Sequence, residues 1–279
     1  MQTVVLLKLA PDTVEELTVA AGERSLDTEF LRFKLSDPDE HALEQALVLK
    51  EKHGGTVTAL ALDAPEVDDV LFTALAKGVD RAVKLSGELT HLHSFAAAQV
   101  FASFLQSDDK GLPSDTLILL RSQGIDDLEG EIGPFLASRL GLPYVGVVTG
   151  VSLDGGSLVV TKEFAGGLRG EFAVSPPAVL GIQSAERPPR YVPIAKVRAA
   201  MKSGRLETVE IAAPAPLAPW NTRSSNALGD EAAYSTGRAR TEVERLYKPT
   251  VTGRATMLDG AAEAVADQIV AVLAKQNLI

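Results

Sequence analysis

Residues 56–86 read TVTALALDAPEVDDVLFTALAKGVDRAVKLS. The apolar, β-branched runs at 57–60 and 82–85 predict two buried strands. Between them, residues 65–66 begin a helical pattern that Gly78 ends. A strand, a helix and a strand in this order are typical of a parallel βαβ unit. The apolar face of the predicted helix consists of Val67, Val70, Leu71, Ala74 and Leu75.

The same alternation covers the first two-thirds of the chain. Further strands are predicted at residues 4–7, 117–120 and 145–148, and further helices at 97–105 and 132–140. The strand runs are apolar almost throughout instead of alternating, which indicates a sheet covered on both faces. We therefore predict an α/β fold with a doubly wound, mostly parallel sheet.

The helix that follows the first strand has a strong start signal. Asp37 is suited to cap it, Pro38 to occupy its first turn, and Glu40 to close a capping box. Gly54 is the expected end of this helix.

The pattern changes after residue 156. Residues 158–160, 171–174 and 178–182 are strand-like runs with Gly-rich turns and no helix between them. We expect them to form an antiparallel extension at the edge of the sheet.

From about Pro188 the globular pattern fades. No element is predicted at 212–230, and a helix is recovered at 258–276, where Asp259 is the expected cap. A chain that leaves its own core and then regains an amphipathic helix usually packs on another molecule. One face of this helix carries Val265, Ile269, Val272 and Leu273.

Composition excludes several classes of protein. The chain has 279 residues and a net charge of −10, which disfavours a nucleic-acid partner. It has no cysteine, which excludes disulfides and thiolate metal sites. No apolar run is long enough to insert into a membrane, and the first residues lack the basic region of a signal peptide, so we expect a cytoplasmic protein.

Known catalytic motifs are missing from the sequence. There is no Walker A sequence, no G-x-G-x-x-G after a strand and no G-x-S-x-G elbow. Only His91 and His93 lie close together among the four histidines, and their spacing favours a surface loop over a metal site.

The loop at residues 121–133 is more informative. It follows a predicted strand and opens a helix, so its backbone N–H groups could face an anion at the carboxyl edge of the sheet. Glu129 and Glu131 oppose this because a phosphate disfavours nearby carboxylates. Adjacent Asp126 and Asp127 rarely converge on one atom, so we do not expect acid–base catalysis there.

Taken in chain order, these segments resemble the β subunit of electron transfer flavoprotein, and most closely the form found with trimethylamine dehydrogenase in methylotrophs. No single motif is specific, but the combination covers nearly the whole chain. The segments that carry the resemblance are 5–12, 37–46, 73–82, 122–127, 141–143, 166–168, 177–180, 189–191, 245–249 and 253–260.

The resemblance implies an adenine-nucleotide α-hydrolase-like, Rossmann-like domain in a heterodimer. The α subunit of the family holds most of the FAD, which takes electrons from a dehydrogenase and passes them to an acceptor such as a quinone oxidoreductase. The implied role is an electron carrier subunit without bond-making chemistry of its own.

The resemblance also implies a structural AMP in the β subunit. Its phosphate would lie at residues 130–133. The positions that correspond to the AMP site are Leu6, Ser36, Asp37, Pro38, Asp39, Leu62, Gln123, Gly124, Ile125, Asp126, Asp127, Gly130, Glu131, Ile132 and Gly133.

The sequence departs from the family pattern at this site. The family often has hydroxyl or amide donors at the phosphate, whereas this chain has Glu131 and Ile132. Arg121 stands where the family commonly has glycine, and it either compensates for the lost donors or fills the pocket. A second FAD in place of AMP, as in electron-bifurcating members, ranks below AMP.

The family docks its dehydrogenase through an apolar side chain after a Pro-Arg-Tyr sequence. Ile194 matches that residue, with Val192 beside it. The expected domains are a nucleotide-binding-type domain at 1–190, a docking segment at 191–202, and an arm with a terminal helix at 203–279 that packs on the α subunit.

Two other functions stay open at this stage. One is a nucleotide-binding enzyme that hydrolyses ATP or adenylates a substrate on a similar domain. The other is a scaffold subunit without a ligand, which is favoured if Arg121 and Glu131 close the pocket.

Overall fold

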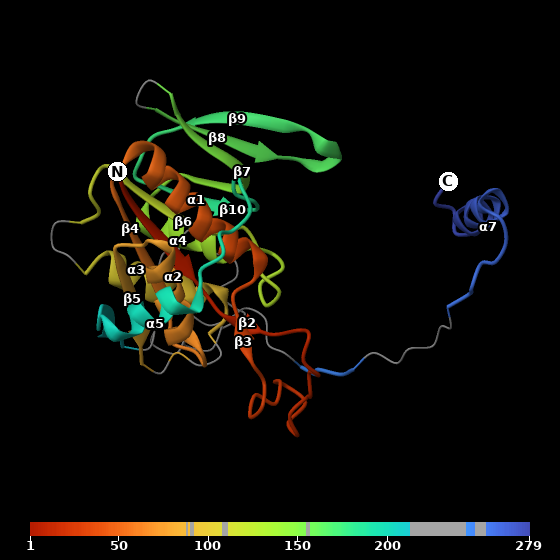
Figure 1. Cartoon of the computed structure of the whole chain (residues 1–279), viewed down its shortest axis with the longest axis horizontal. Coiled ribbons are helices and arrows are strands. Elements are labelled where there is room, and N and C mark those ends of the chain that lie inside the picture. The colour runs from red at the N-terminus through yellow and green to blue at the C-terminus, as the bar shows by residue number, and fades with distance from the viewer. Residues whose placement is uncertain (88, 90–91, 108–110, 155–156, 213–243, 249–254) are drawn as a thin grey trace, which may run out of the picture.

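The computed structural model describes residues 1–87, 89, 92–107, 111–154, 157–212, 244–248 and 255–279. Its centre is a large mixed sheet with helices packed on both faces (Figure 1). In spatial order the strands are β11 (Leu206–Glu210), β5 (Arg81–Ser86), β4 (Thr56–Leu62), β1 (Gln2–Leu7), β6 (Thr116–Arg121), β10 (Ala178–Ile182), β7 (Tyr144–Asp154), β8 (Ser157–Glu163) and β9 (Arg169–Val174).

The strands from β11 to β7 are parallel to their neighbours, and β8 and β9 continue the sheet in antiparallel pairing. The doubly wound, mostly parallel sheet is therefore confirmed. A separate antiparallel pair is formed by β2 (Ala10–Pro11) and β3 (Phe33–Lys34). A short 3₁₀ turn at Ala165–Gly167 links β8 to β9.

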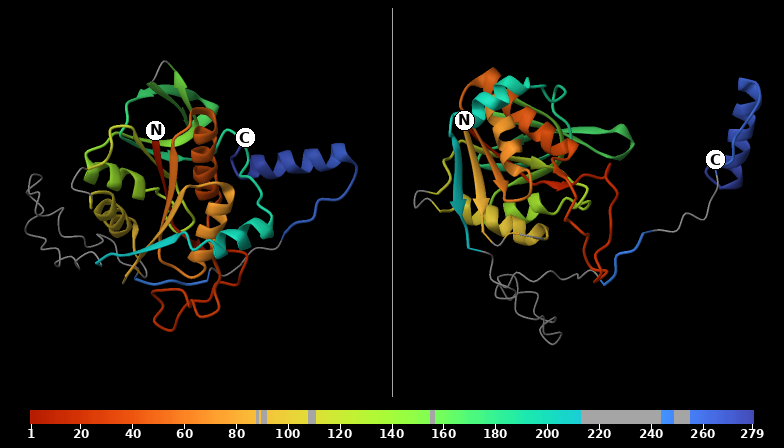
Figure 2. Two further views of the ribbon diagram at one scale, coloured as in Figure 1. Left: turned by 60° about the vertical axis from the view of Figure 1, so that its left-hand side comes forward. Right: turned by 60° about the horizontal axis from the view of Figure 1, so that its bottom comes forward.

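Helices cover the two faces of the sheet in pairs (Figure 2). The helices α1 (Asp37–His53) and α2 (Val67–Lys77) pack on one face, and α3 (Ser94–Leu105) and α4 (Ile132–Leu140) pack on the other. Each pair seals its own apolar core, with Leu43 and Leu71 fully buried on the first face and Phe101 and Leu136 on the second. This double burial explains why the strands are apolar on both sides.

The prediction for residues 178–182 is partly wrong. These residues form β10, which lies between β6 and β7 inside the parallel sheet and not in the antiparallel extension. All five residues are buried, as expected for an interior strand. In the described part of the chain the antiparallel extension consists of β8, which pairs with the long strand β7, and β9, which pairs with β8.

Two predicted helix caps are also wrong. The N-cap of α1 is Ser36, and its backbone N–H donates to Asp39 Oδ2 at 3.2 Å, so neither Asp37 nor Glu40 forms the box. The last helix, α7, spans Ala262–Lys275 with Ala261 as N-cap. Gly260 has a φ of +134°, which breaks the helical conformation between Asp259 and α7.

Residues 206–210 belong to the sheet, although the sequence places them in the arm. They form β11, which pairs in parallel with β5 at the sheet edge. The helix α5 (Ile194–Lys202) precedes this strand and packs against α2. The α/β body therefore extends to about residue 211.

The C-terminal helix differs from the rest. None of its residues is buried, and Figures 1 and 2 show α7 standing clear of the α/β body. No helix in the described part of the chain has the length and apolar character needed to cross a membrane.

Candidate functional site: the switch point of the sheet

The order of the strands places a crevice beside β1. The chain runs from β1 to β4 and β5 on one side, and then returns to β6 on the other side. The carboxyl ends of β1 and β6 therefore flank the topological switch point, where ligands of such sheets bind. These two strand ends deliver Lys8 and Arg121 to the crevice.

Arg121 is the buried centre of an ion cluster at this point. Its side chain is 2% exposed, and its Nη2 donates to Asp126 Oδ1 at 2.6 Å. Its Nη1 donates to Asp39 Oδ2 at 3.2 Å and to the carbonyl oxygen of Lys8 at 3.0 Å. The ammonium group of Lys8 also pairs with Asp126. Two cations and two carboxylates thus balance each other.

Asp39 reaches the cluster from the first turn of α1. It is fully buried, and its Oδ2 also accepts from the Ser36 hydroxyl at 2.5 Å. Its Oδ1 and the Nε of Arg121 have no hydrogen-bond partner among the described residues. Asp39, the capping-box partner of Ser36, is therefore also the counter-ion of Arg121.

Burial and charge act in opposite directions on these groups. Burial raises the pKa of Asp39, and Arg121 only partly offsets this effect. Burial acts on Arg121 in the opposite sense, but Asp39 and Asp126 outweigh it and raise the pKa of the guanidinium. Burial likewise tends to raise the pKa of Asp126, yet Arg121 and Lys8 hold it below its ordinary value. Arg121 therefore stays charged.

The loop after β6 uses its own backbone donors. The N–H groups of Gly124 and Gly130 donate to the Asp127 carbonyl oxygen at 3.0 and 3.1 Å. The Glu131 N–H donates to Asp127 Oδ1 at 3.1 Å. Gly130 adopts a φ of +66°, and a Cβ there would clash with the Ser122 carbonyl oxygen. The loop is thus closed by internal bonds.

Tyr144 covers the start of α4. An added Cβ on Gly133 would lie 2.5 Å from Tyr144 Cε2, so the ring packs directly on this glycine. Burial, followed by the charge of Asp127, raises the pKa of Tyr144 to about 12. The phenol is therefore neutral at physiological pH and fills the space beside the helix N-terminus.

The structure separates the fifteen predicted AMP-site residues into groups. Leu6, Leu62 and Ile132 lie together in the apolar core below α3 and α4. Asp39 and Asp126 meet at Arg121, and Ser36 caps α1, with Asp37 and Pro38 in its first turn. Along the loop, Gly124, Asp127, Gly130 and Gly133 are buried, whereas Gln123, Ile125 and Glu131 are exposed.

A second polar cluster holds the chain that leads to α5. Glu44 of α1 is 1% exposed and accepts from Arg187 Nε at 2.6 Å and from Arg190 Nη2 at 2.9 Å. The backbone N–H of Arg190 donates to Glu44 Oε2 at 3.1 Å. His41 Nδ1 accepts from the Ala185 N–H at 3.2 Å. Residues 185–190 are therefore fastened to α1.

The segment after this cluster is exposed. Ile194, the first residue of α5, is 62% exposed, Tyr191 is 86% exposed, and Val192 is half-buried. An apolar side chain at the end of a rigidly held segment is suited to insert into a partner.

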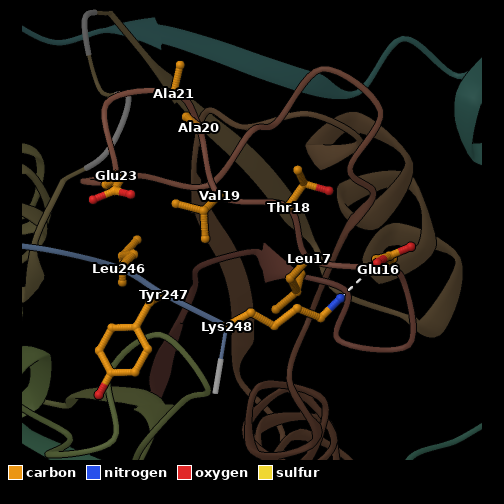
Figure 3. Close-up of a pocket in the computed structure, with 10 residues that line it drawn as sticks. All are labelled: Glu16, Leu17, Thr18, Val19, Ala20, Ala21, Glu23, Leu246, Tyr247 and Lys248. Carbon is orange, nitrogen blue, oxygen red and sulfur yellow. Dashed lines mark hydrogen bonds and ion pairs between the residues drawn. The ribbon is translucent and has the colours of Figure 1, made fainter. Parts of the chain in front are cut away.

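Residues 244–248 lie against the loop that connects β2 to β3 (Figure 3). Lys248 Nζ donates to Glu16 Oε1 at 2.8 Å, Arg245 pairs with Glu23 at 2.9 Å, and the Leu246 N–H donates to the Glu23 carbonyl oxygen at 2.6 Å. The two segments line an open pocket of about 450 Å³. All contacts there are near the surface.

Sequence reasoning missed three functional contributors. Glu44 could have been found, because a carboxylate inside the apolar stripe of α1 needs a buried cation. The sequence contains no comparable signal for Lys8 and Tyr144, because only the order of the strands brings these two residues to the site. The described residues contain no group of three potential metal ligands, and His93 instead accepts from the Ala96 N–H as the N-cap of α3.

The sequence is similar to those of known proteins. The model of the electron transfer flavoprotein domain matches residues 26–216. The β subunit of electron transfer flavoprotein from Bacillus subtilis is 28% identical over 213 residues, covering 76% of this chain and 79% of that protein. The one from Clostridium acetobutylicum is 32% identical over 199 residues, covering 71% and 74%. The one from Methylophilus methylotrophus is 26% identical over 278 residues, covering 98% of each. The chain therefore belongs to the electron transfer flavoprotein family, among the relatives of its β subunits.

Proposed function

We propose that this chain is the β subunit of a heterodimeric electron transfer flavoprotein. The observation that carries the proposal is the likeness to β subunits along nearly the full length, 98% of the chain in one case. The partner is an electron transfer flavoprotein α subunit, and FAD is held mainly by that subunit. The bound FAD supplies the redox chemistry, accepting electrons from a dehydrogenase and delivering them to an acceptor such as a quinone oxidoreductase.

The chain's own residues supply binding and positioning. At the switch point, the charges of Arg121 and Lys8 neutralise those of Asp39 and Asp126. An ATP-hydrolysing or adenylating enzyme gains no support, because the loop that would hold the phosphates presents Glu129 and Glu131 instead of a lysine or hydroxyl. A carrier subunit needs no such group.

The exposed C-terminal helix supports pairing with the α subunit. Ile269 and Val272 of α7 are 45% and 49% exposed, and they share one helix face with Val265 and Leu273. An amphipathic helix gains most of its stability from packing of its apolar face. We infer that α7 and the arm before it pack on the α subunit.

The segment around Val192 and Ile194 supports donor docking. The ion pairs of Glu44 with Arg187 and Arg190 fix the chain immediately before it. Ile194 then presents an apolar anchor at the first turn of α5. We infer that this anchor seats in a pocket of the dehydrogenase.

Reconstitution tests the proposal. The chain, the α subunit of its host and FAD are mixed, and the flavin absorbance of the protein fraction is recorded after desalting. We expect a flavin-containing complex from the two chains together and none from this chain alone. Failure of the two chains to associate, with both folded by circular dichroism, would contradict the proposed function.

A further inference from the structure

We propose that Arg121 takes the place of a nucleotide in this β subunit, so that the crevice at the switch point is closed by the chain itself and holds no AMP. The inference concerns the same crevice as the family's AMP site and rests on the proposed function only for the identity of that ligand. Three features support it: the position of the guanidinium, the balanced charge of the cluster, and the hydrogen bonds and packing of residues 130–133.

The guanidinium occupies the space in front of the loop. A Cβ built on Gly124 would lie within 2.6 Å of Arg121 Nε, so the side chain rests on the backbone of this glycine. The Arg121 side chain is 2% exposed, and Asp39 beneath it is fully buried. Two of the positions that would contact AMP, Asp39 and Asp126, are instead bonded to Arg121.

The charge of the cluster is already balanced. Arg121 and Lys8 are matched by Asp39 and Asp126, so the cluster has no net positive charge to attract a phosphate. A nucleotide phosphate would add negative charge beside Asp126 and Glu131. Burying an unbalanced charge is unfavourable, so the electrostatics reject the anion.

The loop at residues 121–133, which would hold the phosphate, also uses backbone donors for hydrogen bonds within the chain. The N–H groups of Gly130 and Glu131 donate to Asp127, and the ring of Tyr144 packs on Gly133. Three of the four positions expected to cradle the phosphate are therefore committed to the chain itself. An anion would have to displace both the Asp127 bonds and the Tyr144 ring.

The test compares nucleotide content between variants of the intact heterodimer. The chain is co-expressed with the α subunit of its host as wild type, as Arg121→Gly and as the charge-matched double variant Arg121→Gly/Asp39→Asn, with Arg139→Ala on the exposed side of α4 as control. Each complex is denatured, and the released AMP and FAD are quantified by chromatography. AMP is then titrated into each complex while thermal unfolding is followed.

We expect FAD and no AMP in the wild type and in the Arg139 control, with no change of Tm on adding AMP. Removing the guanidinium opens the crevice, and neutralising Asp39 with it keeps Lys8 and Asp126 balanced, so Arg121→Gly/Asp39→Asn is expected to retain AMP or to gain Tm with it. Arg121→Gly alone leaves an excess carboxylate and should gain less. One AMP per wild-type heterodimer would overturn the proposal. Folded variants that still refuse AMP would show that Arg121 is not the group that closes the site. If neither variant folds, the wild-type measurement decides alone, and the FAD content separates this outcome from failure of the proposed function.

Discussion

At the scale of single residues, this chain places its buried charges in two compact clusters that connect distant segments. Arg121 joins β1, α1 and the loop after β6, and Glu44 joins α1 to residues 187 and 190. A buried carboxylate that loses its cation keeps its desolvation cost without compensation. Removing one charged partner from either cluster should therefore destabilise the fold, because the remaining buried charge is left unpaired.

Glu44→Gln is expected to destabilise the heterodimer by about 1–3 kcal/mol, because it removes the charge that holds Arg187 and Arg190. Glu51→Gln is the matched control, since Glu51 pairs with the same arginines but is half-exposed. We expect a change below about 0.5 kcal/mol for the control. Urea unfolding measures both, and equal effects would contradict the role of Glu44.

The stability contributed by Glu44 should also depend on pH. Burial alone would raise its pKa, but Arg190 and Arg187 outweigh burial and lower it from the ordinary 4.5. A lowered carboxyl pKa adds stability that is present above the unfolded value and is lost as the pH falls through the folded value. The advantage of wild type over Glu44→Gln should therefore be constant near neutral pH and shrink below pH 4.5. An advantage that grows on acidification would refute this.

The limits of prediction at this scale have a physical origin. Ser36, Asp37 and Asp39 all have side chains that are suited to cap a helix. Ser36 is the N-cap because the backbone is extended at Ser36 and the helix begins at Asp37. The sequence indicated that Arg121 either compensates for the lost phosphate donors or fills the pocket. Deciding between these two roles requires the three-dimensional structure, because Asp39 and Asp126 lie far apart in the sequence and both bond to Arg121.

At the scale of elements, strong periodic patterns were reliable and neighbour relations were not. The helices α2, α3 and α4 and the strands β1, β4, β5, β6 and β7 lie where the apolar patterns place them. The location of β10 was missed because a fully apolar run fits any interior strand equally well. The short strand β11 was missed because only two of its five residues are even half-buried.

Gly130→Ala tests the loop that connects β6 to α4. A side chain at φ +66° is strained, and its Cβ would meet the Ser122 carbonyl oxygen, so we expect a loss of about 2 kcal/mol or more. Gly22→Ala is the control, because nothing lies within 4 Å of its added Cβ and its φ is not in the left-handed region. Thermal unfolding that shifts equally for both would argue against a closed loop.

Ile194→Ala tests the docking segment. We expect electron transfer from the dehydrogenase to slow by roughly tenfold or more, while the flavin spectrum stays unchanged, since an exposed anchor supplies binding energy to a transient interface. Met201→Ala, which removes another exposed apolar side chain of α5, is the control. Stopped-flow reduction of the flavin at varied dehydrogenase concentration separates docking from chemistry. An unaltered second-order rate for Ile194→Ala would remove the segment from the interface.

At the scale of the whole molecule, the α/β body is packed on both faces of its sheet, whereas the C-terminal helix is exposed. The body has a core on each face of the sheet, whereas α7 has no buried residue. The sequence predicted an arm from residue 203 that ends in a helix, but α5 and β11 belong to the α/β body, which extends to about residue 211. Several predicted positions lie outside the described part of the chain: His91, residues 213–230 of the stretch 212–230, and residues 249 and 253–254 of the segments 245–249 and 253–260.

Deletion of residues 215–279 tests whether the C-terminal arm is needed for pairing with the α subunit but not for folding of the α/β body. We expect the α/β body to stay folded, because β11 and both cores are retained. Stable pairing with the α subunit should be lost, because the apolar face of α7 is removed. Gel filtration of the truncated chain with the α subunit gives the answer, and an intact heterodimer would contradict the assignment of the arm.

The most direct test of the central claim is a native mass spectrum of the complex purified from its own host through a tag on this chain. We expect a heterodimer of this chain and an electron transfer flavoprotein α subunit that carries one FAD. A lone chain, or a complex without flavin, would contradict the claim that this protein is an electron-transferring β subunit.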